Sequence, residues 1–150
     1  MKLIYKTFDE LTIKELYELL KSRAEIFVVG QNCAYQDLDD IDYNSIHVFY
    51  QNDNGNVSAY LRLFRRNDDP DVIQMGRVLT LKHGVGLGGK ILHDGIDVAK
   101  NYMKAKKIYI EAQTYAIGFY EREGFKICSE EFLEEGIPHV KMELFFRRQL

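Results

Sequence analysis

Four glycines between a predicted strand and a predicted helix constrain this chain more than any other feature of its sequence. Residues 72–80 have the character of a strand, and a helical pattern follows the segment Gly84-Val85-Gly86-Leu87-Gly88-Gly89 and continues to about Met103. Glycine lets a backbone approach a ligand closely, and the start of a helix presents unpaired N–H groups and the positive end of the helix dipole. The segment therefore predicts a site for phosphate or pyrophosphate.

Two common phosphate-binding patterns fit this segment less well. The dinucleotide fingerprint G-x-G-x-x-G belongs in a βαβ unit, whereas these glycines follow a predicted hairpin in the middle of the chain. Gly84, Gly89 and Lys90 match part of the P-loop pattern, but Ile91 stands where that pattern needs Ser or Thr to hold Mg²⁺. A nucleotide-binding P-loop protein therefore remains only a third-ranked alternative.

The other elements predict a mixed α/β fold. A capping box, Thr12 with Glu15, opens the first helix, and Asn52-Asp53-Asn54-Gly55 marks the turn of a hairpin. Residues 30–46 are expected to form a loop. Further strands are expected at 3–8, 47–50, 57–64, 108–111, 125–128 and 139–146, and further helices at 12–27 and 116–122. This order predicts a largely antiparallel sheet of about six or seven strands with one local parallel pair, flanked by helices.

Composition narrows the class of protein. A chain of 150 residues with 46% hydrophobic residues fits one domain over residues 1–150. The net charge is -3 and there is no basic stripe, so a nucleic-acid partner is not expected. The sequence has neither a signal-peptide core nor a membrane-spanning apolar run, and its two cysteines lie far apart without metal-ligand spacing. Free thiols, no metal and a cytoplasmic location are therefore expected.

Two motifs resemble those of the GNAT N-acetyltransferases. The segment from His83 to Gly88 resembles the family's Q/R-x-x-G-x-G/A signature, and the segment from Phe119 to Phe125 resembles its F-Y-x-x-x-G-F segment. Gln113 and Ala116 precede the second motif at the spacing where the family usually has Asn and Ala. The motifs cover residues 77 to 125, and the predicted order of elements matches over nearly the whole chain.

The first half of the chain and one later segment resemble the ElaA-like branch of this family. The residues that carry this resemblance are Arg23, Phe27-Val28-Val29, Gln31-Asn32-Cys33, Tyr35, Asp37, His47 and Gly136-Ile137-Pro138-His139. Two positions depart from the pattern. His83 stands where the family usually has Arg or Gln, and Gly30 stands where the branch usually has Glu.

The resemblance implies a GNAT-like fold and acetyl-CoA as the acetyl donor, with no metal. The residues that it implies for binding coenzyme A are Val78, Leu79, Thr80, His83, Gly84, Val85, Gly86, Leu87, Gly88, Gly89, Gln113 and Tyr120. In the family the loop amides hold the pyrophosphate, and backbone near Val78 would polarise the thioester carbonyl. Tyr120 stands where the family places the general acid that protonates the leaving sulfur.

The sequence indicates the general base and the acceptor pocket less specifically than it indicates the coenzyme A site. Glu111 ends a predicted strand and could accept the amine proton directly or through water, with His139 and His47 as alternatives. The candidate residues of the acceptor pocket are Arg23, Gln36, Asp37, His47 and His139. Asp37, Asp39, Asp40 and Asp42 could attract a cationic amine, but a solvated acidic loop is the favoured interpretation.

The sequence therefore predicts an enzyme that acetylates a primary amine of a small molecule or a peptide. An acyl-CoA-binding sensor without turnover is the alternative, since it would keep the glycine loop and leave the acid and base idle. The sequence leaves open whether a second copy of the chain is a partner in a homodimer.

Overall fold

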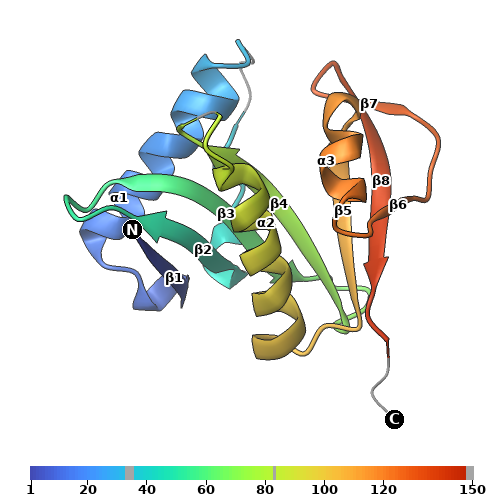
Figure 1. Cartoon of the computed structure of the whole chain (residues 1–150), viewed down its shortest axis with the longest axis horizontal. Coiled ribbons are helices and arrows are strands. Elements are labelled where there is room, and N and C mark those ends of the chain that lie inside the picture. Colours follow the sequence, from blue (N-terminus) through green and yellow to red (C-terminus); the bar gives the residue numbers. More distant parts are fainter. Residues whose placement is uncertain (33–35, 83, 148–150) are drawn as a thin grey trace.

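The computed structural model describes residues 1–32, 36–82 and 84–147 as a sheet with helices on both faces (Figure 1). The strands are β1 (Lys2–Thr7), β2 (Ile46–Gln51), β3 (Val57–Arg65), β4 (Val72–Thr80), β5 (Lys107–Gln113), β6 (Lys126–Ile127), β7 (Phe132–Glu134) and β8 (Ile137–Phe145). The α-helices are α1 (Ile13–Arg23), α2 (Leu87–Asp97) and α3 (Ile117–Glu121). Short 3-10 helices are η1 (Phe8–Glu10), η3 (Ile41–Asn44) and η5 (Thr114–Ala116), and π-helical turns are η2 (Ala24–Val29) and η4 (Val98–Tyr102).

The sheet has the order β1-β2-β3-β4-β5-β8-β6, and β7 also pairs with β8. Among the strands of the described residues, β4 and β5 run parallel and the other pairs are antiparallel. The predicted mixed, mostly antiparallel sheet is confirmed. The sheet has eight strands instead of six or seven, because the three-residue strand β7 was not predicted from the sequence.

The parallel pair is short, and this opens the sheet. Hydrogen-bonded register joins β4 and β5 only at Val72↔Lys107, Ile73↔Ile108 and Gln74↔Tyr109. Beyond these three pairs β4 continues to Thr80 and β5 to Gln113, and the two strands diverge (Figure 1). The sheet is therefore split along part of its length between β4 and β5.

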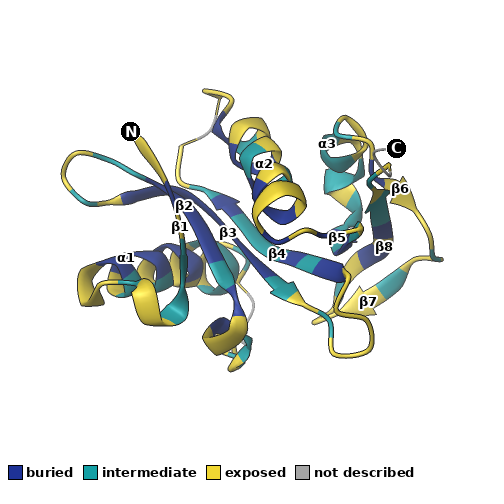
Figure 2. Cartoon of the chain, turned by 90° about the horizontal axis from the view of Figure 1, so that it is seen from below, coloured by how far each residue is buried: buried dark blue, intermediate teal, exposed yellow. Residues whose placement is uncertain are grey.

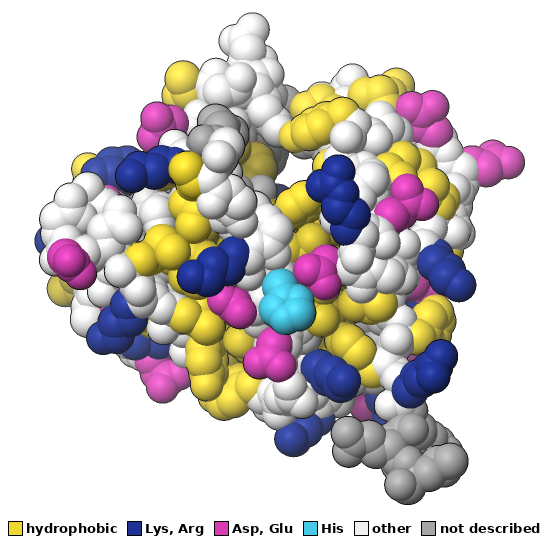
Figure 3. Space-filling view, viewed as in Figure 1, with side chains coloured by type: hydrophobic (Ala, Val, Ile, Leu, Met, Phe, Trp, Pro, Cys, Tyr) yellow, Lys and Arg dark blue, Asp and Glu magenta, His cyan; other side chains and the backbone are white. Residues whose placement is uncertain are grey.

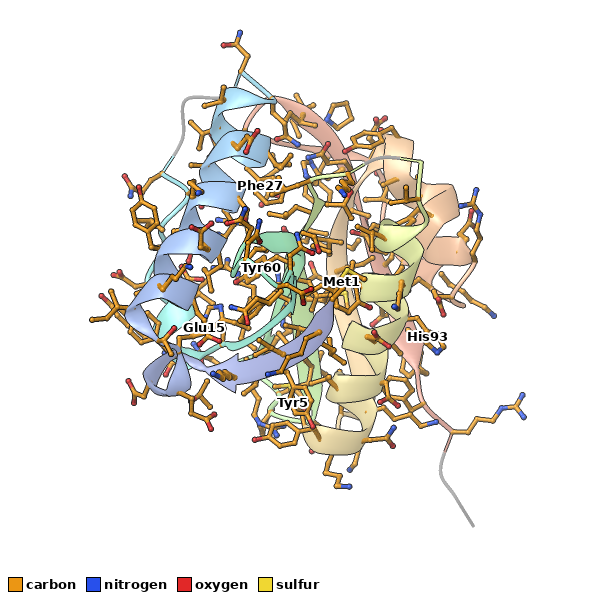
Figure 4. All side chains as sticks on the ribbon, turned by 60° about the vertical axis from the view of Figure 1, so that its left-hand side comes forward. Met1, Tyr5, Glu15, Phe27, Tyr60 and His93 are labelled. Atoms are coloured by element: carbon orange, nitrogen blue, oxygen red, sulfur yellow. The ribbon has the colours of Figure 1, made fainter. Side chains whose placement is uncertain are left out.

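The two faces of the sheet carry different helices. Helices α2 and α3 cover one face and α1 covers the other (Figure 2). Neighbouring residues of β3 alternate between these faces, since Leu61 and Leu63 pack in the cluster that contains α2 while Tyr60 packs in the cluster that contains α1. In Figure 4 Tyr60 lies between α1 and the sheet. Gly95 lets α2 approach closely, because a Cβ there would lie 2.5 Å from Cδ2 of Leu61.

The first helix begins as predicted and ends differently. Its capping box is confirmed, because Thr12 Oγ1 accepts the Glu15 N–H at 3.0 Å and a Glu15 carboxylate oxygen accepts the Thr12 N–H at 2.8 Å. After α1 the chain widens into the π turn η2, which closes with a bond from Gly30 N–H to the Glu25 carbonyl at 2.7 Å. A Cβ at Gly30 would lie 2.9 Å from the carbonyl oxygens of Glu25 and Ile26, so this turn favours glycine there.

Two other expectations can be compared with the structure. Cys128 is a free, exposed thiol as predicted, and Cys33 lies outside the described residues. In the described part of the chain, none of the helices combines the length and apolarity that spanning a bilayer requires.

The favoured interpretation of the acidic loop was wrong. Asp37 and Asp42 are 8% and 7% exposed, because three arginines from other elements surround the loop. Arg23 comes from α1, Arg62 from β3 and Arg77 from β4. The ion pairs are Arg23 with Asp37 at 3.1 Å and with Asp42 at 2.6 Å, Arg62 with Asp39 at 2.6 Å and with Asp42 at 3.0 Å, and Arg77 with Asp37 at 2.8 Å. We call these six side chains the arginine–aspartate network. Asp40 stays exposed outside it.

The network also surrounds His47, which is fully buried. One ring nitrogen lies 2.7 Å from the Tyr60 hydroxyl and the other lies 2.9 Å from the Asp42 carbonyl oxygen. Burial lowers the pKa of His47, and the positive charges of Arg23 and Arg62 lower it further. The hydrogen bond to the Asp42 carbonyl and the negative charge of Asp42 act in the opposite direction. The ring is therefore neutral and held by the core.

Asp42 should account for much of the stability that the network provides. Burial alone would raise its pKa, but the guanidinium groups of Arg23 and Arg62 outweigh this and hold the pKa below its usual value. We expect Asp42→Asn to lower the free energy of unfolding by about 3 kcal/mol or more at pH 7, because it leaves buried arginines without their charge partner. Urea unfolding measures this difference.

The control is Asp40→Asn, at an exposed residue with a φ of 66°, a conformation that asparagine tolerates well. It should change stability little. A carboxylate with a lowered folded pKa stabilises above its unfolded pKa of about 3.9 and loses that effect as the pH falls through the folded pKa. The difference between wild type and Asp42→Asn should thus hold down to about pH 4 and shrink below it. A difference that is absent at pH 7 would contradict the role of Asp42.

Candidate active site

A cavity of about 520 Å³ lies where β4 and β5 diverge. Residues 74–78 of β4 form one wall, and Ile110, Glu111 and Gln113 of β5 form the other. Residues from β3, η2, the following loop, η3, η5, α3 and the β7–β8 hairpin complete the lining. The space-filling view shows the surface hollowed between the part that carries α1 and the part that carries α3 (Figure 3). The split in the sheet is thus an accessible cavity.

The structure brings only some of the candidate residues together. The candidates that line the cavity are Gln36, Val78, Glu111, Gln113, Tyr120 and His139. Arg23, Asp37 and His47 are not among the lining residues. All three are buried: Arg23 donates to Asp37, and His47 contacts the Asp42 carbonyl. His83 lies outside the described residues.

The glycine segment opens α2 without a side-chain cap. Gly86 is the N-cap residue in the left-handed conformation, with a φ of 75°, and the bond that follows it joins the Lys90 N–H to the Gly86 carbonyl at 3.2 Å. The first N–H groups of a helix have no acceptor within that helix. The amides that follow Gly86 therefore point unpaired donors and the positive end of the helix dipole away from α2.

One side of this segment is packed and the other is open. A Cβ at Gly88 would lie 3.4 Å from the Phe119 ring of α3 and 3.9 Å from Thr80 at the end of β4. A Cβ at Gly84, Gly86 or Gly89 would meet nothing within 4 Å. The segment is thus anchored beside β4 and α3, and it presents a bare backbone surface that fits the pyrophosphate of the coenzyme A implied by the sequence motifs.

Tyr120 of α3 presents an unpartnered hydroxyl at the cavity. Its ring makes edge contacts with Phe119 and Phe125, at centroid distances of 5.1 and 5.7 Å. Among the described residues no partner accepts or donates a hydrogen bond at this hydroxyl. Burial raises the pKa of Tyr120, with a smaller contribution from Tyr115, so the hydroxyl remains protonated at neutral pH.

Two acidic residues and a histidine also line the cavity. A carboxylate oxygen of Glu111 accepts a hydrogen bond from the Tyr109 hydroxyl at 3.0 Å. Burial, followed by the neighbouring Glu111 carboxylate, raises the pKa of Glu134. His139 places Nε2 3.5 Å from a Glu134 carboxylate oxygen, and its Nδ1 lies 2.7 Å from the Ile137 carbonyl oxygen, to which it donates. These groups can hold and exchange protons next to the cavity.

Sequence reasoning missed Glu134, because β7 was not predicted. A signal was present in Glu135-Gly136, where both residues have positive φ, of 51° and 74°, and form the turn between β7 and β8.

Comparison with known proteins gives a consistent result. A family model described as the acetyltransferase (GNAT) domain matches residues 19–146. A UPF0039 protein of Schizosaccharomyces pombe is 36% identical over 147 residues, which cover 96% of this chain and 97% of the relative. Protein ElaA of Escherichia coli is 33% identical over 139 residues, which cover 89% of this chain and 90% of the relative.

Solved structures are similar over nearly the whole chain. The crystal structure of an acyl-CoA N-acyltransferase from Pseudomonas aeruginosa has a TM-score of 0.88 and 34% identity, over 95% of this chain and 99% of that chain. The crystal structure of Escherichia coli ElaA has a TM-score of 0.87 and 28% identity, with the same coverage.

The open face of the glycine segment can be tested with small substitutions. Gly89→Ala should raise the free energy of unfolding by up to about 1 kcal/mol, because alanine is the better helix former and its methyl group meets no protein atom. The same variant should bind coenzyme A at least about tenfold more weakly, because its methyl group would keep the pyrophosphate from approaching the amides. The loss of one hydrogen bond to a charged group costs about 1.5–3 kcal/mol. Calorimetric titration with coenzyme A and urea unfolding measure the two effects.

The matched control is Gly118→Ala on α3, another exposed helical glycine with open space around it. It should stabilise the fold without changing the affinity for coenzyme A. Gly86→Val should lose both affinity and some stability, because valine is strained at a φ of 75°. Unchanged affinity in Gly89→Ala and Gly86→Val would place the coenzyme elsewhere.

Proposed function

The chain belongs to the GNAT acetyltransferase family, and on that premise we propose that it transfers an acetyl group from acetyl-CoA to a primary amine of a small molecule or a peptide. The observation that carries this proposal is the free hydroxyl of Tyr120 in a cavity bordered by the diverging strands. The glycine segment lies at the end of β4 and beside α3, so a donor held there by its phosphates can extend toward that cavity.

The donor would be bound mainly by backbone. The amides at Gly86, Gly88 and Gly89 would hold the pyrophosphate, and the pantetheine would follow β4 along Val78, Leu79 and Thr80. Among the described residues no register pair joins β4 to β5 beyond Gln74 and Tyr109, so the backbone of β4 near Val78 could bind a ligand. A backbone N–H at Val78 would polarise the thioester carbonyl, whose oxygen gains negative charge as the amine attacks.

The reaction needs two proton transfers. The neutral amine attacks the thioester carbonyl carbon, the new C–N bond forms and the C–S bond breaks. Tyr120 donates its proton to the leaving sulfur, while Glu111 accepts the surplus proton of the amine directly or through water. The products are the acetylated amine and the free thiol of coenzyme A.

The acceptor would enter on the side of the β7–β8 hairpin. Glu134 and His139 of this hairpin line the cavity, as does Gln36 of the loop after η2, and their hydrogen-bonding groups can orient an amine before attack. Catalytic turnover of acetyl-CoA decides between this proposal and an acyl-CoA sensor. Release of free thiol from acetyl-CoA with at least one member of a panel of primary amines supports the enzyme, whereas coenzyme A binding without thiol release from any amine supports the sensor.

Tyr120→Phe tests the proposed acid. The substitution removes one hydroxyl and little volume, so folding and the KM for acetyl-CoA should barely change, while kcat should fall by about 100-fold or more. The raised pKa of Tyr120 places any loss of activity caused by its ionisation above the usual tyrosine range of about pH 10. Steady-state kinetics with the best amine of the panel measure both effects.

Tyr102→Phe is the matched control, since Tyr102 is 55% exposed and its ring lies against Tyr5, away from the cavity lining. It should retain full activity. If Tyr120→Phe turned over within a few-fold of wild type, Tyr120 would be a packing residue and solvent or another group would protonate the thiolate.

A further inference from the structure

The central strand β4 contains a bulge next to the cavity. Tyr60 pairs with Leu79, whereas Arg62 pairs with Gly76, so the single residue Leu61 of β3 faces both Arg77 and Val78. The extra residue of a bulge leaves the hydrogen-bonded ladder and turns the local backbone. The bulge falls where β4 has already lost β5 as a partner, so this turned backbone borders the cavity.

Arg77 adopts an unfavourable backbone conformation at this bulge. Its φ is 54°, in the left-handed region that an L residue with a long side chain rarely occupies. Such conformations persist only where the surrounding structure imposes them, and they cluster at functional sites. Something other than local preference must therefore hold Arg77 in place.

The side chain of Arg77 supplies that restraint. Its Nε donates to an Asp37 carboxylate oxygen at 2.8 Å, and its Nη2 donates to the Asp37 backbone carbonyl at 3.0 Å. Asp37 is held from the other side by Arg23, whose Nε and Nη2 donate to the same carboxylate and the same carbonyl at 3.1 Å each. Arg23 is fully buried on α1, so the restraint on β4 reaches the core of the opposite layer.

We propose that Arg77, tethered by Asp37, is a positioning residue that fixes the bulge of β4 so that the backbone at Val78 faces the acyl group. Arg77 acts through the backbone that follows it, not through contact with the acceptor. This inference rests on the proposed function for its catalytic consequence, whereas the tether and the bulge are features of the fold. The arginine–aspartate network thereby acquires a role in catalysis besides its role in stability.

The choice of substituent at residue 77 separates a backbone role from a side-chain role. Arg77→Gly removes the tether but tolerates the positive φ, so the bulge should survive. Arg77→Ala removes the tether and penalises that φ, so the bulge should relax. If Arg77 instead bound the acceptor with its guanidinium group, the two variants would be equally impaired, mainly in the KM for the amine.

The expected kinetic result follows from this difference. Arg77→Ala should lower kcat about 100-fold, because displacing a catalytic group by about 1 Å has an effect of that size. Arg77→Gly should retain kcat within about tenfold of wild type, and both variants should keep the KM for the amine. Asp37→Asn, which weakens the tether and leaves Arg77 in place, should fall between them. The matched control is Arg147→Ala, at an exposed residue after β8 that is not among the residues lining the cavity, and it should match wild type.

Crystal structures of Arg77→Ala and Arg77→Gly keep the test independent of turnover. The proposal expects the two-to-one pairing of Arg77 and Val78 against Leu61 in the glycine variant and its loss in the alanine variant. If the wild-type protein bound coenzyme A but released no thiol, the proposed function would be refuted. The two crystal structures would still show whether the Arg77–Asp37 tether fixes the bulge. Equal kcat in the two variants, or an unchanged bulge in Arg77→Ala, would overturn the inference.

Discussion

The site depends on the loss of hydrogen bonding between β4 and β5 after Gln74 and Tyr109. A continuous sheet would have filled the space between these strands with its own ladder. Because the pairing stops after three residue pairs, β4 and β5 both present backbone and side chains to a cavity. The same divergence places Tyr120 of α3, Glu111 of β5 and the bulge of β4 around one space, although they lie far apart in the sequence.

An opened sheet needs support on the side where pairing is lost. Residues 36–42 provide it here, since their carboxylates bind arginines from α1, β3 and β4. Buried charges are stable only when they are well paired, and one atom, Arg62 Nε, has no hydrogen-bond partner among the described residues. The network is therefore stable only in one arrangement of its side chains, and it holds the backbone of β4 beside the cavity in one position.

Local patterns predicted much of this structure. The capping box at Thr12 and the bounds of β4 depend on residues close in sequence, and they were predicted correctly. The helix expected after Gly89 begins earlier, at Leu87. The acidic loop was misjudged because its partners Arg62 and Arg77 lie 20 or more residues away, and no local pattern indicates such pairing. The candidate site residues divide in a similar way. The catalytic candidates Tyr120 and Glu111 line the cavity, whereas the pocket candidates Arg23 and His47 lie in predicted elements but are buried by long-range partners that no local pattern indicates.

A crystal structure of the protein with coenzyme A tests the central claim most directly. The account predicts that the pyrophosphate accepts hydrogen bonds from amides between Gly86 and Gly89, and that the thiol lies between β4 and β5 within hydrogen-bonding distance of the Tyr120 hydroxyl. A coenzyme bound away from the glycine segment, or a thiol outside the gap between these strands, would contradict it.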